Sequence, residues 1–451
     1  MSTLTNATSG SQAPTLLRLA TAGSVDDGKS TLVGRLLHDT KSVLADQFAA
    51  VERISRDRGL SSADLALLTD GLRAEREQGI TIDVAYRYFA TPRRSFVLAD
   101  CPGHVQYTRN TVTGSSTADV VVLLVDARHG VVEQTRRHLA VVALLRVPHV
   151  VIAVNKIDLV DFSADVFADV DAQVQQVARE LGIPDAVTVP VSALDGDNVV
   201  ERSTRTPWYA GPALLELLED LPTAEEPDAE PFRMPVQLVL RPQTAAPVPA
   251  LRDYRGYAGQ IGSGVVAVGD EVVVLPSGRR TRVSGIDLGP DELTRAYAPQ
   301  SVAVRLADDV DVSRGDVIVA ASSVPELTRE SDALLAWLDE RPLQPGARVL
   351  VKHGARTVKA IVDRVDSRLD LEALALQPTE SLGLNDIGRV SLRLAGPLPL
   401  EPYADSRRHG SFLVIDPSSG GTLAAGMVGV PGIWASDVLP DADAAEDWLA
   451  S

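Results

Sequence analysis

The sequence is poor in cysteine and poor in basic residues relative to acidic ones. Cys101 is the single cysteine among 451 residues, which excludes an internal disulfide and a cysteine-rich zinc site and suits a reducing cytoplasm. Lysine and arginine number 43 against 61 acidic residues, for a formal net charge of -18. Because non-specific nucleic-acid binding rests on basic side chains that neutralise phosphates, this charge weighs against nucleic acid as a partner.

Long apolar runs are also missing. No run approaches the roughly 20 residues that a membrane helix needs. Residues 1–15 are rich in serine and threonine and lack the basic start and apolar core of a secretory signal. We therefore expect a cytoplasmic protein with no membrane partner.

What is present is the composition of a globular protein of several domains. The chain is 45% hydrophobic and 23% charged, and its length allows two to four domains because single cores stop growing well below that size. From Leu16 to about Leu221, short β-rich apolar runs alternate with helical patterns that begin near Lys29, Gln106, Gln134, Ala164 and Gly211. The runs are Leu16–Ala22, Ser95–Ala99, Val120–Asp126, His149–Asn155 and Val187–Val191. This alternation predicts an α/β domain over residues 16–221, with helices on both faces of a parallel sheet.

The pattern changes after a Pro- and acid-rich stretch, Pro222–Pro231, which has the composition of a linker. Short alternating runs separated by Gly, Pro and Asp turns predict a β-barrel domain over 232–322 and another over 345–433. The expected strands are Val236–Leu240, Gly264–Val268, Glu271–Leu275, Arg282–Ile286, Val302–Arg305, Val317–Val319, Arg348–Val351, Val358–Val365, Ile387–Leu394, Ser411–Ile415 and Leu423–Val428. Val268–Glu271 has the composition of a tight turn, and Glu330–Asp339 that of a short amphipathic helix or a loop.

The strongest chemical motif lies between the first expected strand and the first expected helix. It fits the phosphate-binding loop G-x-x-x-x-G-K-[ST] and comprises Gly23, Ser24, Val25, Asp26, Asp27, Gly28, Lys29 and Ser30, with Thr31 opening the helix. Glycines let the backbone amides approach phosphate oxygens, and the helix N-terminus adds positive partial charge. Lys29 is expected to reach the β- and γ-phosphates and Ser30 to bind Mg²⁺. A chance Gly-rich turn is the alternative, and the strand and helix around the motif disfavour it.

A second motif follows the strand Ser95–Ala99 and comprises Asp100, Cys101, Pro102, Gly103 and His104. Asp100 is expected to hold the Mg²⁺ water shell, and Gly103 to give its amide to the γ-phosphate and to move when that phosphate leaves. His104 is the candidate for orienting the attacking water, with a turn histidine of no catalytic role as the alternative. Thr81 is expected to close the second Mg²⁺ position, although a threonine chosen for β propensity explains it as well.

Base specificity is expected at the ends of two later strands. In Asn155-Lys156-Ile157-Asp158, the Asp158 carboxylate can accept hydrogen bonds from both guanine donors, a pattern that adenine does not present. Two charge-assisted bonds of roughly 1.5–3 kcal/mol each discriminate about a thousandfold or more. The stem of Lys156 can cover the base, and Ser192, Ala193 and Leu194 can offer a backbone amide to guanine O6. The four elements together predict a GTPase that binds GTP and GDP.

These motifs, together with Thr69–Phe89, resemble the GTPase (large) subunit of bacterial sulfate adenylyltransferase, a group similar to translation elongation factors Tu and 1-alpha. Asp27 marks the sulfate-activating branch, because the elongation factors usually carry histidine there. The other marks are Leu68–Leu72, Asp83–Phe89, and Phe232–Val239 with Asp253–Gly259. Residues 243–252 depart from the family as a lengthened loop, and the sequence has no second phosphate-binding loop for a fused adenylylsulfate kinase.

The resemblance implies an elongation factor Tu-like architecture, an α/β P-loop GTPase domain followed by two β-barrel domains, with GTP and Mg²⁺ as its ligands. It also implies a smaller catalytic subunit as partner, which joins ATP and sulfate into adenylyl sulfate and pyrophosphate while this chain hydrolyses GTP. A translation factor that delivers aminoacyl-tRNA is the alternative, and the acidic charge and Asp27 argue against it.

Overall fold

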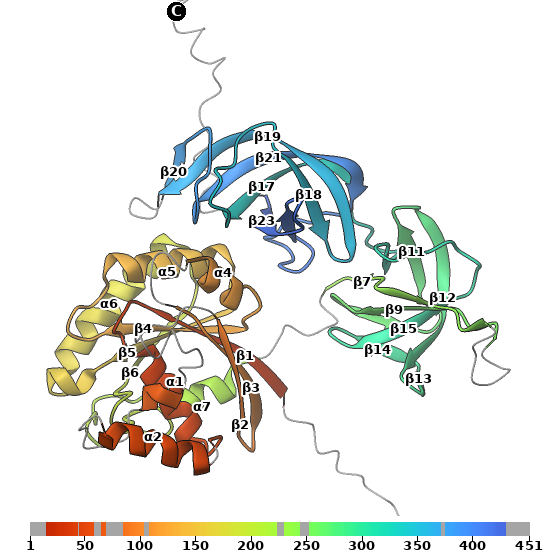
Figure 1. Cartoon of the computed structure of the whole chain (residues 1–451). Coiled ribbons are helices and arrows are strands. Elements are labelled where there is room, and N and C mark those ends of the chain that lie inside the picture. Colours follow the sequence, from red (N-terminus) through yellow and green to blue (C-terminus); the bar gives the residue numbers. More distant parts are fainter. Residues whose placement is uncertain are drawn as a thin grey trace, which may run out of the picture. The chain divides into compact units, whose positions relative to one another are not determined.

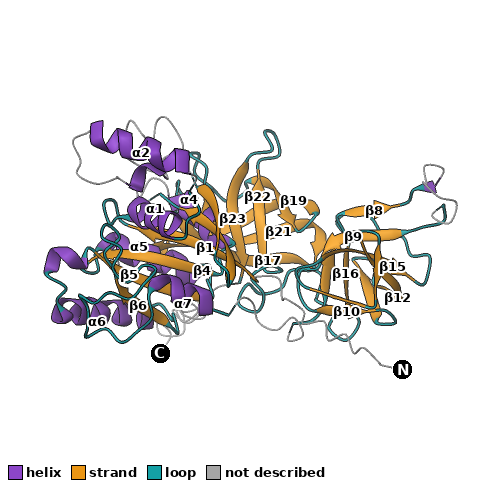
Figure 2. Ribbon diagram, turned by 90° about the horizontal axis from the view of Figure 1, so that it is seen from below, coloured by secondary structure: helices purple, strands orange, loops and turns teal. Residues whose placement is uncertain are grey.

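The structure is a computed structural model that describes residues 15–43, 45–57, 65–68, 84–102, 108–222, 230–243, 252–370 and 375–429. The chain divides into two compact units, residues 1–223 and 224–451 (Figure 1). Helices belong to the first unit, whereas the second is built almost entirely of strands (Figure 2).

The first unit holds a six-stranded sheet in the order β2-β3-β1-β4-β5-β6. Its strands are β1 (Thr15–Gly23), β2 (Ala85–Ala90), β3 (Arg94–Asp100), β4 (Val120–Asp126), β5 (His149–Asn155) and β6 (Ala186–Pro190). Its helices are α1 (Lys29–Asp39), α2 (Ala45–Asp57), α4 (Thr108–Ser116), α5 (Glu133–Leu144), α6 (Ala164–Glu180) and α7 (Leu214–Asp220), with short helices η1 (Leu65–Leu68) and η3 (Ile157–Val160). All strands but the edge strand β2 run parallel, as the sequence predicts.

Helices cover both faces of this sheet. Leu32 and Leu36 of α1 and Leu214 of α7 pack in one core with the strand residues Leu19 and Val122, and Figure 1 shows α4 and α5 on the opposite face. Since both faces are covered, the central strand β4 is buried along its whole length, which explains its continuous apolar run.

The expected elements of this unit match the observed ones closely. The bounds of β4 and β5 are those predicted, and β6 begins one residue earlier than expected. The helix expected near Gly211 begins at Leu214, and Gln106 lies outside the described residues. Because parallel strands end at one edge of a sheet, Gly23, Asp100, Asp126 and Asn155 come together there.

The second unit begins with a sheet ordered β7-β16-β11-β12-β15-β9-β8, with β13 beside β12, and a separate pair β10-β14. The strands are β7 (Arg233–Pro235), β8 (Leu238–Leu240), β9 (Gly256–Gln260), β10 (Val265–Ala267), β11 (Glu271–Leu275), β12 (Arg279–Leu288), β13 (Asp291–Leu293), β14 (Arg295–Tyr297), β15 (Ser301–Leu306) and β16 (Val317–Ala320). The strand expected over Val236–Leu240 is shorter in the structure, where only Leu238–Leu240 forms β8 and pairs with β9.

The rest of this unit is a closed six-stranded barrel in the order β18-β22-β23-β17-β21-β19, which the pairing of β18 with β19 closes. The strands are β17 (Thr328–Trp337), β18 (Arg348–His353), β19 (Arg356–Asp370), β20 (Ala375–Pro378), β21 (Ile387–Leu398), β22 (Ser411–Ile415) and β23 (Thr422–Val428), with β20 beside β19.

The expectation of a helix or loop over Glu330–Asp339 is wrong, since this stretch is the strand β17. Its run Ala333–Ala336 consists of alanine and leucine, which favour helices. Helix propensity alone therefore predicts the wrong secondary structure for this run. Hydrogen bonding to β21 on one side and β23 on the other, with burial of the whole run, overrides that local preference.

Candidate nucleotide-binding site

The expected phosphate-binding loop connects β1 to α1, and its conformation depends on two glycines. Gly23 has φ 145°, and a Cβ there would lie 2.9 Å from the backbone oxygen of Leu124. Gly28 has φ 92° and precedes the first residue of α1, and its Cβ would lie 2.4 Å from Nδ2 of Asn155. Any side chain at either position would therefore push the loop away from the sheet edge.

Lys29 is buried at the first turn of α1 and points back into its own loop. Its Nζ donates to the backbone carbonyl of Gly23 at 2.9 Å and to that of Ser24 at 2.7 Å. An ammonium has three donors, so one remains for a ligand in the loop. Burial lowers the pKa of Lys29, while the charges of Asp27 and Asp100 oppose that shift. A bound polyphosphate would compensate for the lost hydration of the ammonium.

Asp27 closes the loop from inside. Its Oδ2 accepts a hydrogen bond from the Ser24 amide at 2.6 Å, and burial raises the pKa of this carboxyl despite that bond. Its neighbours Val25 and Asp26 are exposed, and Asp26 has φ 65°, in the left-handed region. In the sequence, Asp27 is only a residue typical of the sulfate-activating branch. The structure adds a local role, because its carboxylate holds the turn by accepting the Ser24 amide.

Asp100 ends β3 with only 1% of its surface exposed, and its Oδ1 accepts a hydrogen bond from the Thr21 hydroxyl at 2.8 Å. Ser30 is the second residue of α1 and is partly exposed, as is Thr31 after it. A hydroxyl and a carboxylate are hard oxygen ligands, which fits Mg²⁺. Within the described residues, no group of three or more His, Cys, Asp and Glu side chains is placed to hold a metal ion by itself.

Beyond Asp100, Cys101 and Pro102 are buried, and the carbonyl of Pro102 accepts a hydrogen bond from the Thr111 hydroxyl at 3.3 Å. Burial raises the pKa of the Cys101 thiol, which disfavours a reactive thiolate. Gly103, His104 and Thr81 lie outside the described residues.

Asn155, at the end of β5, connects the phosphate loop to the base loop. Its Nδ2 donates to the backbone carbonyl of Asp27 at 2.7 Å, and its Oδ1 accepts from the Ala193 amide at 2.9 Å. Asn155 is 2% exposed, so both bonds form in a dry environment. A single side-chain amide therefore holds the two halves of the expected site in register.

The segment after Asn155 turns sharply. Lys156 has φ 62°, and Asp158 lies in the first turn of η3 and is partly exposed. The Nζ of Lys156 forms an ion pair with Asp126 Oδ2 at 2.9 Å, and Arg128 Nη2 donates to the same oxygen at 2.7 Å. Burial works to raise the pKa of Asp126, but the hydrogen bonds from Arg128 and Lys156 outweigh it and hold that pKa well below its usual range.

Asp126 was not among the expected site residues. Its signal in the sequence is its position as the last residue of the strand beside β5, where it pairs in register with Asn155. It fixes the ammonium of Lys156, and thereby the stem that is expected to cover the base.

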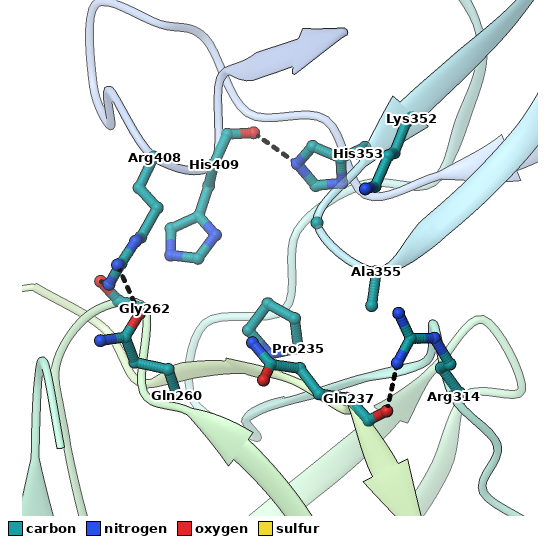
Figure 3. Close-up of a pocket in the computed structure, with 11 residues that line it drawn as sticks. Pro235, Gln237, Gln260, Gly262, Arg314, Lys352, His353, Ala355, Arg408 and His409 are labelled. Atoms are coloured by element: carbon teal, nitrogen blue, oxygen red, sulfur yellow. Dashed lines mark hydrogen bonds between the residues drawn. The ribbon is translucent and has the colours of Figure 1, made fainter. Parts of the chain in front are cut away.

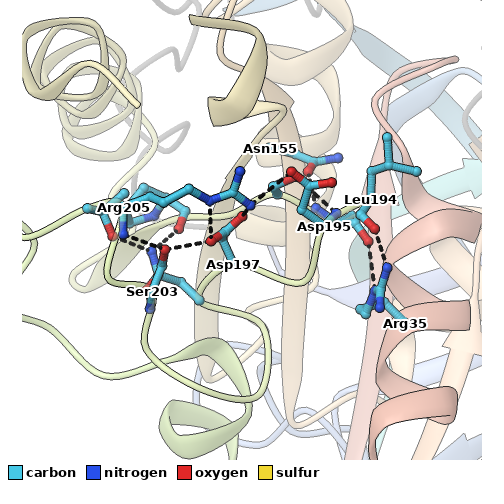
Figure 4. Close-up of polar contacts among 12 residues, drawn as sticks. Arg35, Asn155, Leu194, Asp195, Asp197, Ser203 and Arg205 are labelled. Atoms are coloured by element: carbon cyan, nitrogen blue, oxygen red, sulfur yellow. Dashed lines mark hydrogen bonds and ion pairs between the residues drawn. The ribbon is translucent and has the colours of Figure 1, made fainter. Parts of the chain in front are cut away.

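The loop of Ser192, Ala193 and Leu194 is held from two sides (Figure 4). Arg35 of α1 donates from Nε to the Ala193 carbonyl at 3.2 Å and from Nη2 to the Leu194 carbonyl. Ser192 is fully buried, and its carbonyl accepts from the Gly196 amide at 2.7 Å. No motif in the sequence indicates Arg35, because the groups to which it donates are backbone carbonyls.

Further along the same loop, Arg205 forms ion pairs with Asp195 and Asp197, and its guanidinium lies 4.4 Å from the centre of the Phe162 ring. The Ser203 hydroxyl also donates to Asp197 (Figure 4). These contacts brace the outer side of the base loop.

Comparison with known proteins agrees with this geometry. Residues 15–225 match the elongation factor Tu GTP binding domain, and residues 330–429 match the GTP-eEF1A C-terminal domain-like family. The chain is 47% identical over 415 residues to sulfate adenylyltransferase subunit 1 of Alteromonas mediterranea, covering 92% of this chain and 86% of that protein. The chain belongs to the sulfate adenylyltransferase subunit 1 family.

Two further relatives match over a similar share of this chain. The subunit 1 protein of Chromobacterium violaceum is 48% identical over 416 residues, again covering 92% of this chain and 86% of the relative. The bifunctional enzyme CysN/CysC of Mycobacterium tuberculosis is 53% identical over 416 residues, covering 92% of this chain and 67% of that longer protein.

Membership of the sulfate adenylyltransferase subunit 1 family confirms the predicted resemblance and the predicted GTPase fold with β-barrel domains after it. The chain is accordingly a GTP-binding enzyme of the GTPase class. In the described part of the chain, no helix has the length and apolar character needed to cross a membrane.

Proposed function

We propose that this chain is the GTPase subunit of a sulfate adenylyltransferase, and that its GTP hydrolysis drives adenylyl sulfate formation on a smaller partner subunit. The names of its relatives support the assignment, since the subunit 1 proteins match over 86% of their length. The observation that carries it in this chain is the Asn155 bridge, which holds a phosphate loop and a base loop together as one nucleotide site.

The triphosphate binds in the loop over Gly23–Ser30. Backbone amides and the remaining donor of Lys29 contact the phosphate oxygens, and the N-terminus of α1 adds positive partial charge. Ser30 and Asp100 hold Mg²⁺, which neutralises charge on the β- and γ-phosphates when bound. Phosphoryl transfer needs little covalent help, so this positioning and electrostatic stabilisation supply most of the catalysis.

The sequence motifs assign three further residues to this site: Thr81, Gly103 and His104. Thr81 closes the second Mg²⁺ position, and Gly103 gives its amide to the γ-phosphate. His104 orients the attacking water. Loss of the γ-phosphate releases these segments and reports hydrolysis to the rest of the chain and to the partner.

The base contacts are those of guanine. Asp158 accepts the two donors of the guanine edge, and the Lys156 stem covers the ring. Asn155 already engages the Ala193 amide, whereas the Leu194 amide has no hydrogen-bond partner among the described residues. We therefore assign the contact with guanine O6 to Leu194.

The partner reaction explains why a GTPase is needed. When a sulfate oxygen attacks the α-phosphorus of ATP, pyrophosphate leaves and a mixed phosphoric–sulfuric anhydride forms, which is strongly uphill. Each 1.4 kcal/mol that GTP hydrolysis contributes shifts that balance about tenfold. Coupling requires that hydrolysis be gated by the adenylyl step.

Reconstitution of the full chain with the smaller subunit tests the proposal. We expect ATP and sulfate together to accelerate GTP turnover, and adenylyl sulfate to accumulate in proportion to the GTP cleaved. A rate of GTP turnover that stays the same when the smaller subunit, ATP and sulfate are added would overturn the proposal. Stimulation instead by ribosomes and aminoacyl-tRNA would favour a translation factor.

A further inference from the structure

A cleft in the second unit lies between its first sheet and its closed barrel, and its eleven lining residues include three cationic and two amide side chains. It has a volume of about 310 Å³ and is lined by Arg314, Lys352, Arg408, Gln260 and His409, among other residues (Figure 3). None of the lining residues is acidic, although the chain as a whole carries a net charge of -18. A concentration of positive charge on so acidic a chain points to an anionic ligand.

Two of the cations are held in place by the protein. Arg408 donates from Nη2 to Oε1 of Gln260 at 2.8 Å, and Arg314 donates from Nη1 to the backbone carbonyl of Gln237 at 2.8 Å (Figure 3). The partner of Arg314 is a neutral carbonyl, so it does not neutralise the charge of that guanidinium. Lys352 of β18 has no side-chain hydrogen bond or ion pair within the described part of the chain.

His409 adds a buried polar group to this cleft. Its ring is 5% exposed, and its Nε2 has no hydrogen-bond partner among the described residues. Burial first, and then the nearby His353, Arg233 and Arg408, lower the pKa of His409 to about 3, so the ring is neutral at pH 7. A neutral imidazole retains one N–H that can donate to an anion.

The backbone around His409 is shaped to admit the ring. A Cβ at Gly262 would lie 2.5 Å from Cε1 and 2.7 Å from Nε2 of His409. Only glycine at position 262 therefore leaves enough room for the imidazole ring. His353 donates from Nε2 to the His409 carbonyl at 2.9 Å and fixes the backbone there. Arg233 also forms a partly buried ion pair with Glu401 at 2.8 Å, which joins the first sheet of this unit to the closed barrel. These contacts hold the backbone and the side chains around the cleft in place.

We propose that this cleft binds a small molecule through a phosphate or sulfate group. Such a tetrahedral dianion matches guanidinium donors, a mobile ammonium and an imidazole N–H, in a cleft without carboxylates. The volume lies at the lower end of the range for small-molecule sites, which leaves room beyond the anion itself. This site is separate from the nucleotide site and does not depend on the proposed function.

Equilibrium dialysis of the full chain with radiolabelled inorganic phosphate or sulfate tests the proposal. The protein is first loaded with GDP and Mg²⁺ so that the phosphate loop is filled, and ionic strength is kept constant with sodium chloride. We expect saturable binding, weakened about tenfold or more in Lys352→Gln and in Arg314→Gln because each loses a charge-assisted contact. The control Lys359→Gln removes the same charge from an exposed side chain outside the cleft and should bind as the wild type does.

Preferential retention of sulfate identifies a sulfate group as the ligand's anion, and preferential retention of phosphate identifies a phosphate group. Absence of saturable binding, or equal weakening by Lys359→Gln, would overturn the proposal. A second measurement needs no variant. Phosphate or sulfate should protect Lys352 of the wild-type chain from acetylation, measured by mass spectrometry against Lys359, and equal labelling with and without the anions would refute the site.

Discussion

The side-chain amide of Asn155 donates to the backbone carbonyl of Asp27 at 2.7 Å, across 128 positions of sequence. The same side chain accepts from Ala193, so the proposed phosphate loop and the proposed base loop share one buried anchor. Loss of this anchor should affect both ends of the nucleotide together.

We expect Asn155→Ala to weaken GDP and GTP binding about tenfold or more. The change leaves a buried carbonyl and a buried amide unpaired, at about 1–3 kcal/mol each. Titration with a fluorescent guanine nucleotide measures the loss. Asn198→Ala is the matched control, because Asn198 is also a buried amide but bonds Pro190 and Thr206 instead. Equal losses of affinity in the two variants would mean that the Asn155 bridge has no special role.

Lys29→Ala should reduce GTP affinity by about a hundredfold or more, because the charge-assisted contact with the phosphates is lost together with the two hydrogen bonds that hold the Gly23 and Ser24 carbonyls. Isothermal titration calorimetry checks this directly. Lys41→Ala provides the comparison, since Lys41 is exposed just beyond α1. Retained GTP affinity in Lys29→Ala would remove Lys29 from the phosphate site.

Asp126 should make stability depend on pH. Its pKa is lower in the folded chain than its ordinary value of 3.8, so its stabilising contribution is present above about pH 4 and is lost as the pH falls further. We expect Asp126→Asn to destabilise the first unit by about 1–3 kcal/mol near neutral pH. Thermal unfolding of both proteins across this pH range checks the sign, and a difference that grows on acidification would contradict it.

His104→Ala should bind GTP normally and hydrolyse it about a hundredfold or more slowly, because water positioning contributes only during turnover. Single-turnover hydrolysis measured beside nucleotide affinity separates these two effects. Turnover equal to that of the wild type would show that another group positions the water.

The strand ends that carry the proposed nucleotide site were predictable from the sequence, for a physical reason. Ligand-binding loops in a parallel sheet follow the strand ends, and strands buried on both faces stand out as continuous apolar runs. The strands ending at Asp126 and Asn155 were therefore located to the residue. Glycine spacing and a following lysine then predicted a phosphate loop, and the structure places a loop between β1 and α1 at these residues.

Contacts to the backbone were not predictable. Arg35 recognises the carbonyls of Ala193 and Leu194, which carry no side-chain signal, and Asn155 acts through carbonyl and amide groups of two distant loops. In the second unit, β17 was mistaken for a helix or loop because its strand pairing is set by partners far along the chain. Local preference carries no information about such partners.

Base selection provides the most direct test of the whole site. Fluorescent guanine, adenine and xanthine nucleotides are titrated into the wild type and into Asp158→Asn. We expect the wild type to prefer guanine over adenine by about a thousandfold, and the variant to prefer xanthine, because an amide reverses the pattern of donors and acceptors. A wild type that binds adenine and guanine nucleotides equally would contradict the assignment of this site.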